Sequence, residues 1–207
     1  MTPREENHEA RQEKQAAIFD AACRVIREKG FHQARMADIA REAGISYGLV
    51  YHYFGSKSEL FDALVEEWFS AVEILLDRGL DRFETIEEKL GAVADFFLDQ
   101  YEKRPDLVHV SITEFSRSTG NLTPDRLVRF KRLLSKVEEV IRQAQDQGSI
   151  RPDIKARYQT YVFLGAVDSL LSTMVLENQP LKGQAQRQRL AQAILTIFFD
   201  GARPKSG

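Results

Sequence analysis

Apolar residues recur at intervals of three and four positions along almost the whole chain, which is the spacing of one face of an α-helix. No stretch shows the sustained alternation of β-branched residues that is typical of strands. The pattern predicts an all-α fold of about nine helices. The longer helices are expected at about 11–29, 56–80, 85–104, 124–148, 153–176 and 185–202. The first ten residues carry no apolar pattern and are expected to form a mobile arm.

Residues 31–60 predict two short helices joined by a tight turn. The small residue Ala40 allows the second helix to cross close to the first, and Gly44 can adopt the positive φ that such a turn requires. Ser46 is a good N-cap for the second helix, in which Val50 faces inward. This arrangement is typical of a helix-turn-helix that reads DNA.

The outer face of the second short helix is crowded with aromatic and small residues that its own core does not need. A recognition helix that enters the major groove uses such a surface. The face comprises Tyr47, Gly48, Leu49, Tyr51, His52 and Tyr53. Partial burial inside the three-helix unit is the alternative for Tyr51 and Tyr53.

The run GFxxAxMxDIAxxAGISxGxVYxYFxSKxxL resembles the signature of the TetR (tetracycline repressor) family of bacterial transcription regulators. The resemblance implies a three-helix DNA-binding domain at residues 1–55. It also implies a larger helical domain at residues 56–207 that dimerises and binds a small ligand.

The same resemblance assigns DNA contacts residue by residue. It implies that Tyr47, Gly48 and Leu49 approach bases and that Tyr51 and Tyr53 reach phosphates, with Ser46 and His52 beside them. Arg35 departs from the family, which commonly has Ser or Thr there as a helix cap, and is expected to contact a phosphate instead. Lys57 is predicted to bind phosphate independently of the resemblance, because it lies in the first turn of a helix, where the free N–H groups and the dipole favour anions.

Charge and composition fit a specific DNA-binding protein. The net charge is -2, but residues 24–57 hold six basic residues against three acidic ones. A modest basic excess in residues 24–57 of an otherwise acidic chain favours specific DNA binding with few phosphate contacts. The charged N-terminus is unlike a signal peptide, no apolar run is long enough to span a bilayer, and the single cysteine Cys23 excludes an intrachain disulfide. These features predict a cytoplasmic protein that does not enter membranes.

No pattern in the sequence predicts an enzyme. The four histidines are scattered without neighbouring ligands at metal-binding spacing, so no metal site is expected. No P-loop or nucleophile elbow is present, and no cofactor is predicted.

A basic stripe follows one predicted helix, where Arg126, Arg129, Arg132 and Lys136 recur at spacings of three, three and four. A solvated face is the simpler explanation of the stripe alone. Together with the segment GAVDSLLSTMVL, however, the chain is similar to the TetR-like regulators that respond to fatty acyl-CoA. That similarity implies an apolar tunnel for the acyl chain and arginines for the phosphates. The candidate ligand-binding residues are Phe97, Tyr101, Phe115, Arg126, Arg129, Phe130, Arg132 and Phe163.

The sequence therefore predicts a ligand-responsive repressor that binds double-stranded operator DNA as a homodimer and is released by a small apolar effector, with a long-chain acyl-CoA as the candidate. The last two long helices are expected to form the dimer interface. They carry more apolar residues than packing of one helix side within a single chain requires, among them Gly165, Leu170, Ile194 and Ile197. The competing interpretation is a soluble ligand-binding or scaffold protein whose helix-turn-helix only packs.

Overall fold

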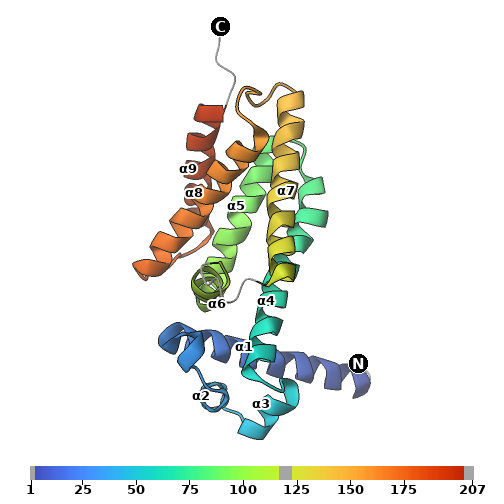
Figure 1. Cartoon of the computed structure of the whole chain (residues 1–207), viewed down its shortest axis with the longest axis vertical. Helices are drawn as coiled ribbons and strands as arrows, with labels where there is room; N and C mark the ends of the chain where they lie inside the picture. Colours follow the sequence, from blue (N-terminus) through green and yellow to red (C-terminus); the bar gives the residue numbers. More distant parts are fainter. Residues whose placement is uncertain (1–2, 117–122, 203–207) are drawn as a thin grey trace. The chain divides into compact units, whose positions relative to one another are not determined.

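The computed structural model describes residues 3–116 and 123–202, without the side chains of residues 3–10, 115, 116 and 202. In this part of the chain every regular element is helical, which confirms the all-α prediction (Figure 1). The long helices are α1 (Pro3–Gln33), α4 (Lys57–Ile74), α5 (Ile86–Lys103), α7 (Pro124–Asp146), α8 (Ala156–Leu176) and α9 (Gln184–Ala202). The short ones are α2 (Met36–Glu42), α3 (Tyr47–Tyr53), α6 (Pro105–Val110), the π-helices η1 (Leu75–Gly79) and η3 (Ser111–Ser116), and the 3₁₀ turn η2 (Leu80–Arg82).

The chain forms two compact units. The first consists of Met1–Trp68 with Asp106–Thr119, and the second of Phe69–Pro105 with Gly120–Gly207. The predicted division at residue 55 falls just before α4, whereas the first unit continues along α4 and also takes in α6. The reason is that the first turns of α4 pack with the helices that precede it, since Leu60 and Phe61 are buried and the centroid of the Phe61 ring lies 4.4 Å from that of Phe31.

The core of the first unit is made by α1, α2, α3 and the start of α4. Phe19 of α1 packs against Phe54 at the end of α3 with ring centroids 5.4 Å apart, and Ile39 and Val50 are fully buried. The helix α1 begins at Pro3, so the predicted mobile arm is wrong. Proline suits the first turn of a helix, because the N–H that it lacks would have no partner there.

The second unit is a bundle in which α5 contacts α7, α8 and α9 (Figure 1). The N-cap of α5 is Thr85, whose side chain accepts a hydrogen bond from the N–H of Glu88 while the Glu88 carboxylate accepts one from the N–H of Thr85, as a capping box requires. Leu90, Val93 and Leu98 then face the bundle interior. The expected helix at 56–80 ends earlier than predicted, because α4 changes at Leu75 into the π-helix η1.

The helix α8 corrects another expectation, since by length and composition alone it is apolar enough to cross a membrane. Two features of the second unit account for its apolar residues. One side of α8 is buried in the bundle, where Phe163 is completely inaccessible. Exposed residues such as Val162 line a cleft between α8 and α9, to which Phe163 also contributes.

A charged clamp joins α9 to α5. The Arg187 guanidinium donates to Asp95 at 2.7 Å, Asp99 at 2.6 Å and Glu102 at 2.9 Å. The arginine side chain is mostly buried, whereas Lys103, which pairs with Asp99, is mostly exposed. The guanidinium thus reduces the repulsion among three carboxylates that lie on one helix face.

We expect Arg187→Ala to lower the free energy of unfolding by about 1.5–3 kcal/mol, because it removes three hydrogen bonds between charged groups and leaves three neighbouring carboxylates without the cation that they share. Lys103→Ala is the matched control, with an expected loss below about 1 kcal/mol for an exposed pair. Urea unfolding of both variants measures the difference, and equal losses would contradict the clamp.

Candidate functional site

The turn between α2 and α3 has the predicted helix-turn-helix geometry. Gly44 has a φ of 67°, and the N–H of Ile45 donates to the carbonyl of Ala40 at 3.1 Å, which closes the end of α2. Ser46 is the N-cap of α3, and its Oγ accepts a hydrogen bond from the N–H of Leu49 at 3.3 Å. The local sequence signals therefore fix the position at which α3 begins.

The outer face of α3 is an exposed aromatic surface. Tyr47 and Tyr51 are 53% and 39% exposed, and their ring centroids lie 4.7 Å apart. Hydrogen bonding with Tyr51 raises the pKa of Tyr47 above its usual value. His52 is also exposed, whereas Tyr53 is half-buried with its ring near that of Phe54.

Gly48 leaves a gap in this aromatic surface. A Cβ atom built at Gly48 would meet no other atom within 4 Å, so the protein's own packing does not require a glycine there. A glycine inside a helix is unfavourable relative to alanine. The position is therefore better explained by close approach of something outside the protein.

Arg35 occupies the N-cap of α2 with extended backbone and makes no side-chain capping hydrogen bond, as its departure from Ser or Thr predicts. Its side chain is exposed and makes no ion pair within the described residues. Neighbouring basic residues are already paired: Arg24 with Glu42 at 2.6 Å and Arg41 with Asp38 at 2.7 Å. Both acidic partners were already counted in residues 24–57, so the predicted basic excess of three remains, and Arg35 contributes to it as an exposed cation.

Lys57 has a role that the sequence analysis did not predict. Its ammonium donates to the carbonyls of Phe31 at 2.7 Å, His32 at 3.1 Å and Ala34 at 3.0 Å, and it lies 4.6 Å from the centroid of the Phe31 ring. An ammonium has three N–H groups, and all three are used here. Lys57 thus joins the end of α1 to the start of α4 and holds the segment that leads into α2, instead of presenting a free charge for the predicted phosphate contact.

We expect Lys57→Met to lower the free energy of unfolding by about 1.5–3 kcal/mol, since three carbonyls lose a charged donor while the apolar stem is kept. Lys29→Met is the control, because among the described residues Lys29 pairs with Asp38 alone, at 3.0 Å, and should contribute less than about 1 kcal/mol. Thermal unfolding compares them, and a Lys57 variant as stable as the control would refute this role.

The basic stripe of α7 lies against acidic residues of α4 and η1. Arg129 makes two 3.1 Å hydrogen bonds to Glu73, and its guanidinium lies 5.1 Å from the centroid of the Phe69 ring. Arg132 pairs with Asp77 at 2.6 Å. The hydrogen bond from Arg129 lowers the pKa of Glu73 below its usual value, so this carboxylate stays charged at neutral pH. Arg126 differs from the others because it is buried.

The aromatic candidates for ligand binding lie at different places in the second unit. Tyr101 donates from its hydroxyl to the carbonyls of Met174 and Gln179 at the end of α8. Phe97 packs against its neighbour Phe96, and Phe130 is exposed on α7. Phe163 is fully buried with its ring 5.5 Å from that of Phe198. The side chain of Phe115 lies outside the described residues.

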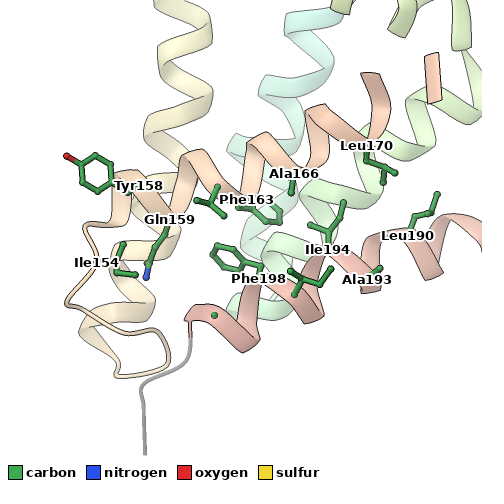
Figure 2. A pocket seen from close by; sticks show the side chains of 13 residues that line it. Ile154, Tyr158, Gln159, Phe163, Ala166, Leu170, Leu190, Ala193, Ile194 and Phe198 are labelled. Carbon is green, nitrogen blue, oxygen red and sulfur yellow. The ribbon is translucent and has the colours of Figure 1, made fainter. Parts of the chain in front are cut away.

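A cleft of about 380 Å³ opens between α8 and α9, with an almost entirely apolar lining (Figure 2). In Figure 2 the rings of Phe163 and Phe198 lie next to each other in an edge-to-face contact, with Ile194 beside them. Ile197, also in the lining, is 76% exposed. Phe97, Tyr101 and Phe130 are not among the residues that line this cleft. The cleft instead contains several residues of the predicted dimer surface.

These features define a class of protein: a helical DNA-binding protein with a helix-turn-helix unit and a separate helical unit. Comparison with known proteins identifies the family. The model described as bacterial regulatory proteins of the tetR family matches residues 18–64, and that of the YsiA-like protein C-terminal region matches residues 65–197. The chain belongs to the TetR family of bacterial transcription regulators.

Relatives cover most of the chain. It is 24% identical over 192 residues to the fatty acid metabolism regulator protein of Bacillus subtilis, and the matched residues make up 93% of this chain and 97% of the relative. It is 29% identical over 172 residues to the HTH-type transcriptional regulator BetI of Escherichia coli, and here the matched residues make up 79% of this chain and 83% of the relative. These relatives are transcriptional regulators.

Solved structures share the fold. FadR from Bacillus subtilis in complex with stearoyl-CoA has a TM-score of 0.72 at 22% identity, covering 90% of this chain and 98% of that one. AibR in complex with isovaleryl coenzyme A and operator DNA has the same TM-score, identity and coverage. The ketosteroid regulator KstR2 of Mycobacterium tuberculosis has a TM-score of 0.77 at 21% identity, covering 92% and 95%.

Proposed function

We propose that this TetR-family regulator is a cytoplasmic repressor that uses α3 to read operator DNA and leaves the DNA when a long-chain acyl-CoA binds. The proposed DNA binding rests on one observation, the exposed Tyr47 and Tyr51 pair beside Gly48. Neither the fold nor the core of the first unit requires these residues. Tyr47, Gly48 and Leu49 are assigned to bases. Arg35, Ser46, Tyr51, His52 and Tyr53 are assigned to the adjoining backbone.

A second copy of the chain is the proposed occupant of the α8–α9 cleft. Val162, Tyr158 and Ile197 expose apolar area on both sides of it. Contiguous apolar surface of this kind is typical of permanent interfaces. A single recognition helix reads only a few base pairs, so two copies held about one turn of DNA apart, ~34 Å, supply the required specificity.

The proposed effector class rests on two observations. The fatty acid regulator of Bacillus subtilis and the acyl-CoA complexes of FadR and AibR resemble this chain over most of its length. In addition, α7 carries three cations on one face, which suits the phosphates of a coenzyme A group. An effector of this kind releases the operator only if it binds more tightly to the form that does not fit DNA.

The test uses DNA from upstream of the protein's own gene in a fluorescence anisotropy assay. Palmitoyl-CoA at tens of micromolar should release the DNA, whereas coenzyme A without an acyl chain should not. Retention of the DNA at saturating palmitoyl-CoA would refute the effector class. A failure to bind any operator DNA would instead favour a scaffold or ligand-binding protein.

A further inference from the structure

The first half of α1 extends beyond the core of the first unit (Figure 1). Core packing on this helix begins at Ile18, which is completely inaccessible, whereas Arg11, Glu13 and Lys14 are exposed. Residues 3–17 form about four helical turns, ~22 Å in length, and alanine is their only apolar residue type after Pro3. The core of the unit therefore does not explain why the helix is so long. We refer to residues 3–17 as the α1 extension.

Charges of opposite sign lie on opposite sides of the α1 extension. Arg11 and Lys14 precede Ile18 by seven and four positions, so they lie on the same side of the helix as its buried residues. Glu13 precedes Asp20 by seven positions, and both are exposed on the opposite side. The extension therefore has a basic side, which continues the buried side of α1, and an acidic side.

This separation of charge does not stabilise the helix itself. Opposite charges three or four positions apart stabilise a surface helix, and like charges at these spacings destabilise it. In residues 3–17 no glutamate lies three or four positions from an arginine or a lysine, whereas Glu5, Glu9 and Glu13 follow one another at intervals of four. Arg11 and Lys14 make no ion pair within the part of the chain that the structure describes. The pattern indicates a partner outside the chain that attracts cations to one side of the helix.

The basic side of the extension is the side on which α3 lies. Phe19 belongs to the buried side of α1, and its ring packs against Phe54 at the end of α3. The outer face of α3 faces away from this core, so DNA bound there lies on the same side of α1 as Arg11 and Lys14. Because the major groove is about 8.5 Å deep, the phosphates beside it stand nearer to α1 than the bases that α3 reaches.

We propose that Arg11 and Lys14 bind the phosphate backbone beside the major groove that α3 enters, and that the acidic side of the α1 extension faces away from the DNA. The glutamates then lie farther from the phosphates by the diameter of a helix, ~10 Å, which exceeds the Debye length of about 8 Å at physiological salt, so their repulsion is largely screened. Such contacts position the protein and read no bases. The inference rests on the proposed function in that α3 binds DNA, and it adds a second DNA-binding surface on α1.

The experiment measures operator affinity by fluorescence anisotropy at several salt concentrations, with DNA from upstream of the protein's own gene. In the double variant Arg11→Gln, Lys14→Gln, the plot of log affinity against log salt should become shallower by roughly two units for each protomer, because each neutralised phosphate contributes about 0.9. Affinity at physiological salt should fall by about tenfold or more. A slope equal to that of wild type would overturn the proposal.

Two matched variants separate contact from net charge. Arg82→Gln, Lys131→Gln removes two exposed cations from the second unit, and Glu9→Gln, Glu13→Gln removes two anions from the acidic side of the extension. Both should keep the slope of wild type within about half a unit. An equal flattening in the first variant, or an equal steepening in the second, would show a general charge effect and overturn the contact. Thermal unfolding checks that all three variants are folded.

Ethylation of single phosphates locates the contact on the DNA. In each half-site, ethylation of one or two phosphates should weaken binding of wild type and have no further effect on the Arg11 and Lys14 double variant. If wild type binds random duplexes at low salt but no operator, the proposed function fails. The comparison of slopes on random DNA then still tests the contact, because phosphate contacts do not depend on sequence. Equal slopes there would overturn it.

Discussion

We expect Ile197→Asp to convert the protein into a monomer and to weaken operator binding by about 10²–10⁴-fold, because each half-site is then bound without the help of the other. Ile197 is 76% exposed in the single chain, so an aspartate there costs the protomer little. In the proposed dimer the same carboxylate is buried in an apolar interface without a partner. Sedimentation at micromolar concentration measures the mass, and anisotropy measures the affinity.

Ile74→Asp is the matched control for this experiment. Ile74 on α4 is also an isoleucine and is 64% exposed, but it is not part of the α8–α9 cleft. This variant should remain dimeric and bind operator as wild type does. A dimeric Ile197→Asp protein, or equal dissociation of both variants, would show that the second copy does not lie on this cleft.

The second large effect is expected for Gly48→Ala, which should separate DNA binding from folding. In the free protein the new methyl group meets nothing within 4 Å, and alanine favours the helix by about 0.5–1 kcal/mol, so the melting temperature should stay the same or rise. Against DNA the methyl group enters the space between α3 and the bases. Operator affinity should fall by about tenfold or more, as for the loss of one good base contact.

Binding of the Gly48→Ala protein to random DNA at low salt provides the internal control, since contacts to the phosphate backbone supply most of that affinity. It should change much less than operator binding. If operator affinity were the same as in wild type, the outer face of α3 would not approach the bases.

Local signals made the first unit largely predictable from sequence. The positive φ at Gly44 and the capping by Ser46 depend on neighbours within four residues, and both occur where the pattern predicted them. Threonine N-caps also lie at the starts of α5 (Thr85) and α7 (Thr123), next to the boundaries that the helical pattern predicts. The exposed face of α3 was predictable from the helical repeat of its apolar residues, because a buried position such as Val50 determines which positions lie on the opposite side of the helix.

Contacts between distant residues were not predictable in the same way. The sequence places Lys57 in the first turn of a helix, but its three carbonyl partners lie more than twenty positions earlier in the chain. The acidic partners of the basic stripe were missed, although Glu73 and Asp77 are four positions apart on a predicted helix, which could have indicated a complementary surface.

The candidate ligand residues show the same limit. Phe163 was grouped with Phe97, Tyr101 and Phe130 because all are large and apolar, yet composition does not tell which side of a helix faces which neighbour. The structure places Phe163 against Phe198 and gives the Tyr101 hydroxyl two carbonyl partners. The set of ligand-binding residues remains a proposal. The sequence could not predict the polar contacts of its members, such as the hydrogen bonds of the Tyr101 hydroxyl.

Selection of binding sites from a library of random DNA duplexes tests the central claim most directly, because the protein itself then chooses the operator sequence. A dimer that reads DNA through two copies of α3 should enrich a pseudo-palindromic sequence whose half-sites are about one turn apart, ~34 Å, and the Gly48→Ala protein should enrich it less. Enrichment of no sequence, or of a single site without two-fold symmetry, would contradict the account.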